Sequence, residues 1–292
     1  MPQHFVAPPQ WEWYIVWYFF LGGLAGGAYL IGTLLRLAGE VRDEGVARLA
    51  FMVAFPLVVI CPILLTLDLG RPQRFWHMML YSQTGAPNFK YWSPMSVGAW
   101  VLLLFGLFAL VSFVESLARG GHLRHPAAHS VARILGGAFG GIFMVVGSIL
   151  GLFVAGYTGV LLSVSNQPIW SDTWTLGGLF LASGLSGAAA TLALLGRGRA
   201  DTDVTERKLS RADRYFIVLE LLLLAAFFVT LGTLASRLFA PRWIVLWILV
   251  LAGTLIPLGM GVGRRGSPVL AGCLVLIGAL ALRIVVVFGA QM

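Results

Sequence analysis

Long apolar runs separated by short polar segments dominate this chain. Eight of them hold the roughly 20 helical residues that are needed to cross a hydrocarbon core about 30 Å thick. They lie at residues 13–37, 48–68, 93–115, 134–163, 172–195, 213–238, 242–262 and 267–289. Inside a bilayer the backbone must satisfy its own hydrogen bonds, so each run is expected to be a helix. The pattern predicts an all-α integral membrane protein with eight transmembrane helices.

The composition excludes an ordinary soluble domain. Of the 292 residues 59% are hydrophobic and 11% are charged, whereas about a quarter of a soluble domain is charged. The mean hydropathy is +0.88. The first apolar run directly follows a leader without Lys or Arg, which predicts a start-transfer helix and no cleaved signal peptide.

Lysine and arginine are distributed unevenly between the two sets of connecting segments. If the N-terminus lies outside, the inner segments carry 14 of the 20 basic residues, the outer segments carry five, and Arg283 lies inside the last span. Inner loops of membrane proteins are enriched in Lys and Arg, so both termini are predicted on the outer, periplasmic side. The net charge of +8 then faces anionic lipid on the inner side and does not indicate nucleic acid.

Two segments have a similar pattern. "GLAGGAYLIGTLLR" (23–36) and "GLSGAAATLALLGR" (184–197) share Gly-Leu-x-Gly-x-Ala at an offset of 161 residues (184 − 23). The similarity predicts two parallel four-helix bundles, residues 1–170 and 171–292, although apolar helices also converge on such patterns by chance. The polar segment 196–214 is expected to be a mobile loop without a site.

An aspartate stands where the second span ends, in "LLTLDLGRPQRFW" (64–76). The helix dipole disfavours a negative charge there, and an apolar environment makes an unpaired carboxylate costly. Gly70 suits the left-handed conformation that ends many helices, and Pro72 stops the helix from resuming. Asp68 is therefore either paired with Arg71 at the interface or a functional carboxylate.

Two tyrosines share the predicted depth of Asp68. Tyr18 lies about one turn into the first span, and Tyr157 lies in the outer third of the fourth, between Gly156 and Gly159. With Asp68 they form a group of polar side chains from three spans near the outer face. The alternative is that the tyrosines belong to the aromatic belt of the membrane interface.

Glu220 and Arg283 are the other ionisable residues within the spans. Glu220 lies about two turns into the sixth span from the inner side, where a proton path or a local hydrogen bond explains it equally well. Arg283 lies in the outer part of the eighth span and is expected to extend toward the outer surface. Together the two residues are candidates for a proton path.

The residues that ligate metals are sparse. The five histidines, at positions 4, 77, 122, 125 and 129, all lie outside the spans, so no buried haem is expected. The two cysteines, Cys61 and Cys273, lie in different spans and cannot hold an iron–sulfur cluster or zinc. We therefore expect neither haem nor metal in this chain. His77 lies in the outer loop that follows Asp68 and borders the same region.

Five motifs together resemble a known family. They are "WEWYIVWYFFLGGLAGGAYL" (11–30), "LDLGRPQRFW" (67–76), "SPMSVGAW" (93–100), "GYTGVLLSVSNQPIW" (156–170) and "LFLASGLSGAAA" (179–190). In this order they resemble the NrfD/polysulfide reductase membrane-subunit family. The resemblance covers the first 190 residues, and the remainder matches in hydropathy alone.

The resemblance implies eight or more spans, no metal in this subunit and a quinone site at the outer face. It also implies a ferredoxin-like iron–sulfur subunit beside that face, with a molybdopterin-type catalytic subunit beyond it. The family's quinone-contacting tyrosine corresponds to Tyr157 and its "DLG" carboxylate to Asp68. Some members carry a histidine where this chain has Tyr18, which leaves the second head-group contact open.

These features predict the membrane subunit of a respiratory oxidoreductase in the bacterial inner membrane. It would bind menaquinone or ubiquinone through Tyr157, Tyr18, Asp68, Arg71 and His77, with Asp68 as the catalytic proton relay. The outer loop 69–92, which is rich in aromatics and arginine, is expected either to dock the iron–sulfur partner or to lie in the headgroups. The alternatives are a secondary transporter or proton channel, and an inert anchor.

Overall fold

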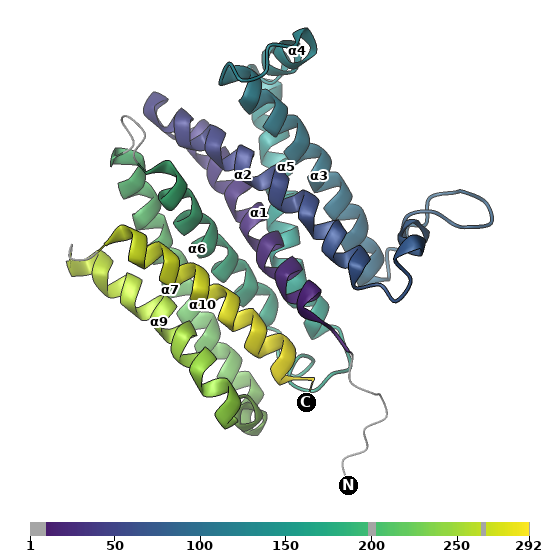
Figure 1. The fold of residues 1–292 in the computed structure, drawn as a ribbon, viewed down its shortest axis with the longest axis vertical. Coiled ribbons are helices and arrows are strands. Elements are labelled where there is room, and N and C mark those ends of the chain that lie inside the picture. Colours follow the sequence, from purple (N-terminus) through teal and green to yellow (C-terminus); the bar gives the residue numbers. More distant parts are fainter. Residues whose placement is uncertain (1–9, 198–202, 264–266, 292) are drawn as a thin grey trace.

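The computed structural model describes residues 10–197, 203–263 and 267–291, and these ranges are almost entirely helical (Figure 1). Eight helices are long and apolar enough to span a membrane, which confirms the predicted fold class. They are α1 (Trp13–Ala38), α2 (Glu44–Leu67), α3 (Pro94–Arg119), α5 (Ala138–Ser163), α6 (Leu176–Gly196), α7 (Asp203–Leu231), α9 (Pro241–Gly263) and α10 (Pro268–Gly289). Between them lie η1 (Val41–Asp43), η2 (Pro72–Met78), α4 (Pro126–Ile134), η3 (Gly232–Leu234) and α8 (Ala235–Leu238).

Local sequence explains several helix ends. The Ser93 side chain caps α3 by accepting a hydrogen bond from the backbone N–H of Ser96, with Pro94 in the first turn. Gly232 has a φ of +52°, a left-handed conformation that suits glycine, and it separates α7 from α8. Gly70 does not adopt a positive φ, contrary to expectation. Instead α2 ends at Asp68, whose backbone N–H donates to Leu64 in a last helical turn.

The segment 196–214 differs from the expected loop. Its residues from 203 onward belong to α7, and residues 198–202 lie outside the described ranges. The Asp43 carboxylate is buried beneath this part of α7. It accepts hydrogen bonds from Thr205 and Lys208, both at 2.6 Å. Tertiary pairing therefore stabilises a helical turn that the polar composition alone does not predict.

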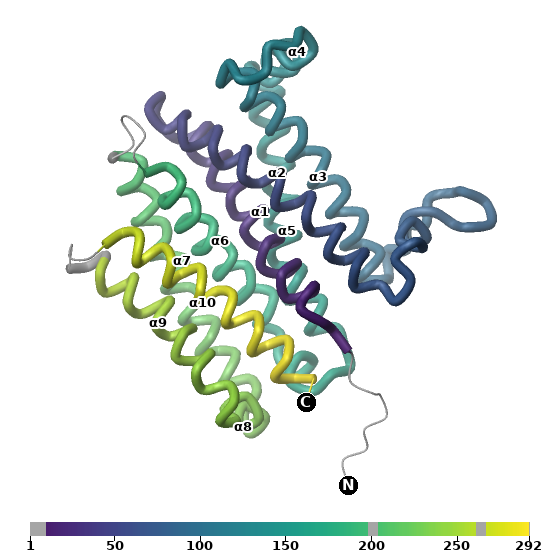
Figure 2. Tube along the Cα trace, in the orientation of Figure 1, coloured from purple at the N-terminus to yellow at the C-terminus, as the bar shows by residue number. Residues whose placement is uncertain are grey.

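The two described ends of the chain meet at one end of the helix assembly, called here the termini end. The Trp11 backbone N–H donates to the Gln291 side chain at 2.8 Å, and the Trp11 ring stacks on Trp170. The loop between α2 and α3 leaves at the same end, whereas α4 lies at the opposite end (Figures 1 and 2). The side of the membrane that each end faces stays a prediction from the charge distribution.

Helices α1 and α6 are central to the assembly. α1 packs against α2, α5 and α6, while α6 also packs against α7 and α10. Gly23 approaches Gly184, and Gly27 approaches Ala188. Both pairs are 161 residues apart (184 − 23 and 188 − 27), so equivalent positions of the two similar segments touch. This contact is what two parallel halves related by an axis along the membrane normal would make, and the division into two bundles stays a prediction.

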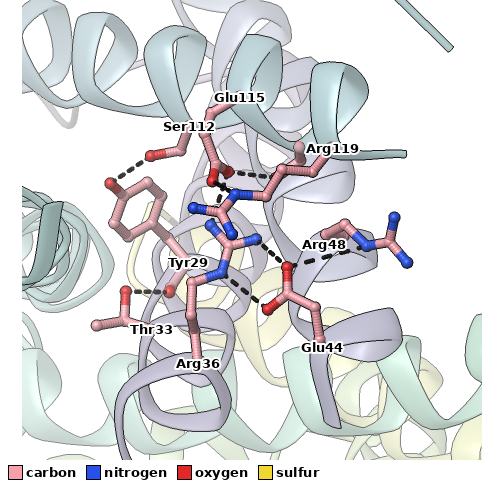
Figure 3. A network of polar contacts seen from close by, with 9 residues as sticks. Tyr29, Thr33, Arg36, Glu44, Arg48, Ser112, Glu115 and Arg119 are labelled. Atoms are coloured by element: carbon pink, nitrogen blue, oxygen red, sulfur yellow. Dashed lines mark hydrogen bonds and ion pairs between the residues drawn. The ribbon is translucent and has the colours of Figure 1, made fainter. Parts of the chain in front are cut away.

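A buried ion cluster joins α1, α2 and α3 at the opposite end (Figure 3). Arg36 contacts Glu44 at 2.8 Å and Glu115 at 2.7 Å, and Arg119 pairs with Glu115 as well. Glu115 is only 1% exposed, so its charge depends on both arginines. Removing one partner of such a pair is strongly destabilising because it leaves a buried charge without compensation.

Candidate functional site

Tyr18 and Tyr157 lie close together near the termini end. Tyr18 of α1 is 3% exposed, and Tyr157 of α5 is 8% exposed. Cys61 of α2 and Val154, one turn before Tyr157 on α5, both lie beside Tyr18 around Gly22. Gly22, one turn further along α1, leaves space between Tyr18, Cys61 and Val154. Three helices thus converge on this pair of tyrosines.

The Tyr157 ring is held between two other contacts. Its hydroxyl donates a 2.6 Å hydrogen bond to the carbonyl oxygen of Pro94, in the first turn of α3. Its ring lies directly against Gly98, where a Cβ would overlap it. On the other side Phe153 stacks on the ring at 5.5 Å and is itself 40% exposed. Tyr157 therefore lies one side chain below the surface that faces lipid.

The two hydroxyls differ in what they can still bind. A tyrosine hydroxyl has one proton to donate and lone pairs to accept with. Tyr157 has given its proton to Pro94, so it can accept from an O–H group. Tyr18 forms no hydrogen bond among the described residues, and its hydroxyl is not one of the fully buried polar atoms that lack a partner, so its O–H stays accessible to a ligand. A ligand with a hydroxyl among its oxygens would satisfy both tyrosines, because it can accept from Tyr18 and donate to Tyr157.

Asp68 lies at the end of α2, about two turns closer to the membrane surface than Cys61. It is half-buried, and no hydrogen bond or ion pair joins it to Arg71, Tyr18 or Tyr157 within the described ranges. Burial raises the pKa of Asp68, and the nearby Glu12 charge adds to the rise, while a backbone hydrogen bond from Glu12 lowers it. Arg71 is exposed. The interfacial Asp68–Arg71 pair is therefore not formed.

The loop 69–92 is tied to the start of α3. Asn88 donates from its side chain to the carbonyl of His77 at 3.0 Å, and its own carbonyl accepts from Trp100 at 3.3 Å. Lys90 donates its backbone N–H to the Ser96 hydroxyl at 3.0 Å. The His77 ring packs on Trp76 in η2 and makes no described contact with the tyrosines. Exposed aromatic side chains cover the loop: Phe75, Trp76, Tyr81, Phe89, Tyr91 and Trp92.

Arg283 is fully buried in the second half of the chain and does not extend toward the surface as expected. Its guanidinium donates to the Phe19, Phe180 and Ala279 carbonyls and to the Ser183 hydroxyl. Ser183 also neighbours Glu220 of α7, which is 4% exposed. The structure thus brings Glu220 and Arg283 together through one serine. Arg283 reaches α1 at Phe19, the residue that follows Tyr18.

The motifs and the geometry agree with a comparison to known proteins. The family profile described as "Polysulphide reductase, NrfD" matches residues 2–292. The chain belongs to the NrfD family. This family and the eight apolar helices make it a multi-pass protein of the bacterial inner membrane.

Among three relatives of this NrfD-family chain, two are reductase subunits by name. It is 26% identical to a selenate reductase subunit of Mesobacillus selenatarsenatis, over 96% of this chain and 74% of that protein. It is 30% identical to a polysulfide reductase subunit of Wolinella succinogenes, over 64% of this chain and 58% of that protein. It is 28% identical to protein NrfD of Escherichia coli, over 76% of this chain and 71% of that protein.

Several residues of the site in this NrfD-family chain were not identified from the sequence. Pro94 and Gly98 position Tyr157, and the motif "SPMSVG" already contained both. Ser183 joins Glu220 to Arg283, and Ser186 donates to Asp213 at 2.6 Å, about two turns before Glu220 on α7. Serines in apolar helices are too common to indicate such pairing. Only the packing of α6 against α7 identifies them.

The residues that the structure describes contain no group of side chains arranged to bind a metal ion. No cluster of three or more His, Cys, Asp or Glu side chains is present in the described ranges. His77, His122, His125 and His129 all lie outside the spanning helices, and His4 lies outside the described residues. The hydroxyls of Tyr18 and Tyr157 can form hydrogen bonds with the oxygen atoms of an organic ligand.

Proposed function

We propose that this NrfD-family chain is the quinone-reactive membrane subunit of a respiratory oxidoreductase complex. The head group of a quinone or quinol would bind between Tyr18 and Tyr157. The observation that carries the proposal is the Tyr18 hydroxyl, which forms no hydrogen bond within the described residues, stays accessible and lies near Tyr157 close to the lipid-facing surface. A transporter or an inert anchor would not need this pair of hydroxyls.

The position of the pair suits a lipophilic substrate. Menaquinone and ubiquinone carry long apolar tails and diffuse within the bilayer. Phe153 is exposed on α5 and stacks on Tyr157, so a head group arriving from the lipid meets the tyrosine after moving one side chain. No passage through the centre of the helix assembly is required.

The chain's own residues would bind the ligand and handle its protons. When bound, the quinone couple supplies two-electron, two-proton redox chemistry. Tyr18 donates a hydrogen bond to one ligand oxygen, and Tyr157 accepts one from a ligand O–H while Pro94 holds its proton. Asp68, with its raised pKa, exchanges protons between this region and the termini end. Arg71 and His77 belong to the loop above and would line the way out.

The loop 69–92 would dock the electron-transfer partner. Aromatic residues and arginine are enriched at the centres of protein interfaces, and six exposed aromatics cover this loop. Asn88 and Lys90 fix the loop to the start of α3, directly above the carbonyl that holds Tyr157. A ferredoxin-like iron–sulfur subunit, with a molybdopterin-type catalytic subunit beyond it, would receive or deliver electrons there. The named relatives belong to selenate and polysulfide reductases.

Proton movement across the membrane is a second element of the proposal. Glu220, Ser183 and Arg283 form a buried polar group that extends to α1 beside Tyr18. Buried ionisable residues in membrane helices commonly serve ion or proton paths. Glu220 would exchange protons with the opposite end, so that turnover at the tyrosine pair moves charge across the membrane.

Binding of a quinol analogue to the purified full chain in nanodiscs tests the proposal. We expect saturable binding, measured by quenching of tryptophan fluorescence, and competition by menaquinol or ubiquinol. A transporter or an inert anchor would show no saturable component, and that result would reject the proposal. The Tyr18→Phe variant should bind more weakly because the free donor is removed.

A further inference from the structure

A cavity lies at the opposite end of the protein, away from the tyrosine pair. Its volume is about 730 Å³, and residues of α6, α7, α9 and the start of α10 line it. This volume is comparable to that of small-molecule sites in proteins, which span roughly 300–1,000 Å³. No residue of the proposed quinone site lines it.

The sequence explains why the helices leave this space. Ala189, Ala190 and Ala193 present small side chains along one side of α6. Pro257 removes a backbone hydrogen bond within α9, where it also lines the cavity. α7 and α9 make few contacts with each other, while α9 packs closely on α10. The inner wall of the cavity is therefore apolar and lies within spanning helices.

The rim of the cavity is strongly basic. Arg207, Arg211 and Arg214 are spaced by four and three residues, so their side chains share one face of α7. Arg197 lines the cavity from the end of α6. None of these four arginines forms an ion pair within the described ranges, in contrast to Arg36 and Arg119 in the ion cluster at the same end.

Two carboxylates also line the cavity, so four arginines face two acidic residues. Asp213 accepts a 2.6 Å hydrogen bond from Ser186 and is directed toward α6. Glu206 lies one position before Arg207 on α7. The excess of positive charge remains at the mouth, and guanidinium groups bind phosphate through paired N–H donors.

We propose that this cavity binds an anionic phospholipid such as phosphatidylglycerol. Its phosphate would contact Arg211 and Arg214, and its glycerol and upper acyl chain would lie along the alanines of α6 and along Pro257 and Met260 of α9. Charge at the mouth and apolar walls within spanning helices match this amphipathic molecule. Free phosphate would leave the apolar walls without a partner. Basic pockets between membrane helices are known to bind anionic headgroups.

The bound lipid would also fill the gap between α7 and α9. Its acyl chain would supply the contacts that these helices do not make with each other. Arg211 and Arg214 would be neutralised by the same phosphate, which lowers their mutual repulsion on α7. The lipid thus acts as a structural ligand of the second half of the chain.

Native mass spectrometry of the full chain, released from phosphatidylglycerol nanodiscs, measures this binding. We expect one retained phosphatidylglycerol, with phosphatidylcholine unable to replace it. Arg211→Gln with Arg214→Gln should weaken retention roughly tenfold or more, the scale of losing a charge-assisted hydrogen bond. The control is Arg124→Gln with Arg133→Gln, which removes two exposed charges from the same end outside the cavity and should retain the lipid.

A third variant separates the site from general surface charge and from misfolding. Ala193→Phe fills the apolar part of the cavity and leaves every arginine in place, so it should also lose the lipid while the protein remains monodisperse. Equal loss in the control variant would overturn the proposal in favour of non-specific attraction. Full displacement by millimolar inorganic phosphate would overturn it in favour of a free anion.

Discussion

The hydroxyl of Tyr157 donates its proton to the carbonyl of Pro94 across a distance of 2.6 Å. This hydrogen bond joins α5 to the first turn of α3 and determines what the tyrosine can still recognise. With its proton engaged, the hydroxyl accepts hydrogen bonds, and a quinol O–H offers one while a quinone carbonyl does not. For the proposed quinone site, this geometry predicts tighter binding of the reduced form.

Tyr157→Phe should therefore weaken quinol binding more than quinone binding. Losing one neutral hydrogen bond costs about 0.5–1.5 kcal/mol, or up to about tenfold in Kd. Titration of the purified chain with reduced and oxidised analogues measures both values. Tyr29→Phe is the matched control. Tyr29 is also a buried tyrosine of α1, but it lies about three turns from Tyr18 and its hydroxyl bonds to Ser112 of α3. Equal losses for both redox forms would contradict the acceptor role.

Gly98→Ala should impair the same site without altering any polar group. The added Cβ would overlap the Tyr157 ring and displace it from Pro94. Gly106→Ala on the same helix is the control, since nothing lies within 4 Å of the position of its Cβ. We expect weaker quinol binding for Gly98→Ala and unchanged binding for Gly106→Ala. Unchanged binding in both variants would show that the position of Tyr157 does not matter.

Asp68→Asn should change the pH dependence of both stability and turnover. Because the folded protein raises the pKa of Asp68, its protonated form is favoured in the fold. The stabilisation is present below the unfolded pKa and is lost as the pH rises through the folded pKa. The variant should then melt slightly higher than the wild type at neutral pH and equally at acid pH, in thermal scans.

The same substitution should slow quinol-linked electron transfer in the assembled complex. Asparagine keeps the shape of aspartate and cannot take up a proton, so the step that uses the carboxylate as a base is lost. Rates recorded across pH for both proteins test this expectation. If the two pH profiles coincide, Asp68 has a structural role only.

Glu220→Gln should separate electron transfer from proton movement. Glu220 lies beside Ser183, which bonds to Arg283, and it is not one of the residues proposed to bind the quinone. In proteoliposomes containing the complex, we expect electron transfer to continue while proton uptake at the opposite end is lost. Glu40→Gln, an exposed carboxylate at that end, is the control. Unaltered proton uptake in Glu220→Gln would remove Glu220 from the path.

Amine-reactive crosslinking tests the docking surface directly, because the sequence contains two lysines. Lys90 lies in the loop at the termini end, and Lys208 lies at the opposite end, paired with Asp43. We expect a cysteine-rich partner to be captured through Lys90. Lys90→Arg should abolish the crosslink and leave the complex intact. Capture through Lys208 would overturn both the predicted orientation and the docking model.

The sequence by itself determined the number of spanning helices. An apolar run of about 20 residues in a bilayer folds as a helix, because its backbone N–H and C=O groups must form hydrogen bonds within the run. The ends of α1 and α9 accordingly fall within one residue of those predicted. The order of motifs likewise indicated the family, and it included Tyr157 and Asp68 before any contact was known.

Only the tertiary structure decided which polar side chains meet. Hydropathy assigns depth along a helix but not rotation about its axis, so Tyr18, Tyr157 and Asp68 were predicted at one depth. The structure brings Tyr18 beside Cys61 and Val154, one turn before Tyr157, whereas Asp68 lies about two turns beyond Cys61. The partners of Arg283 come from α1, α6 and α10. Such pairing depends on the faces that the glycines of α1 and α6 bring together, which the one-dimensional pattern does not contain.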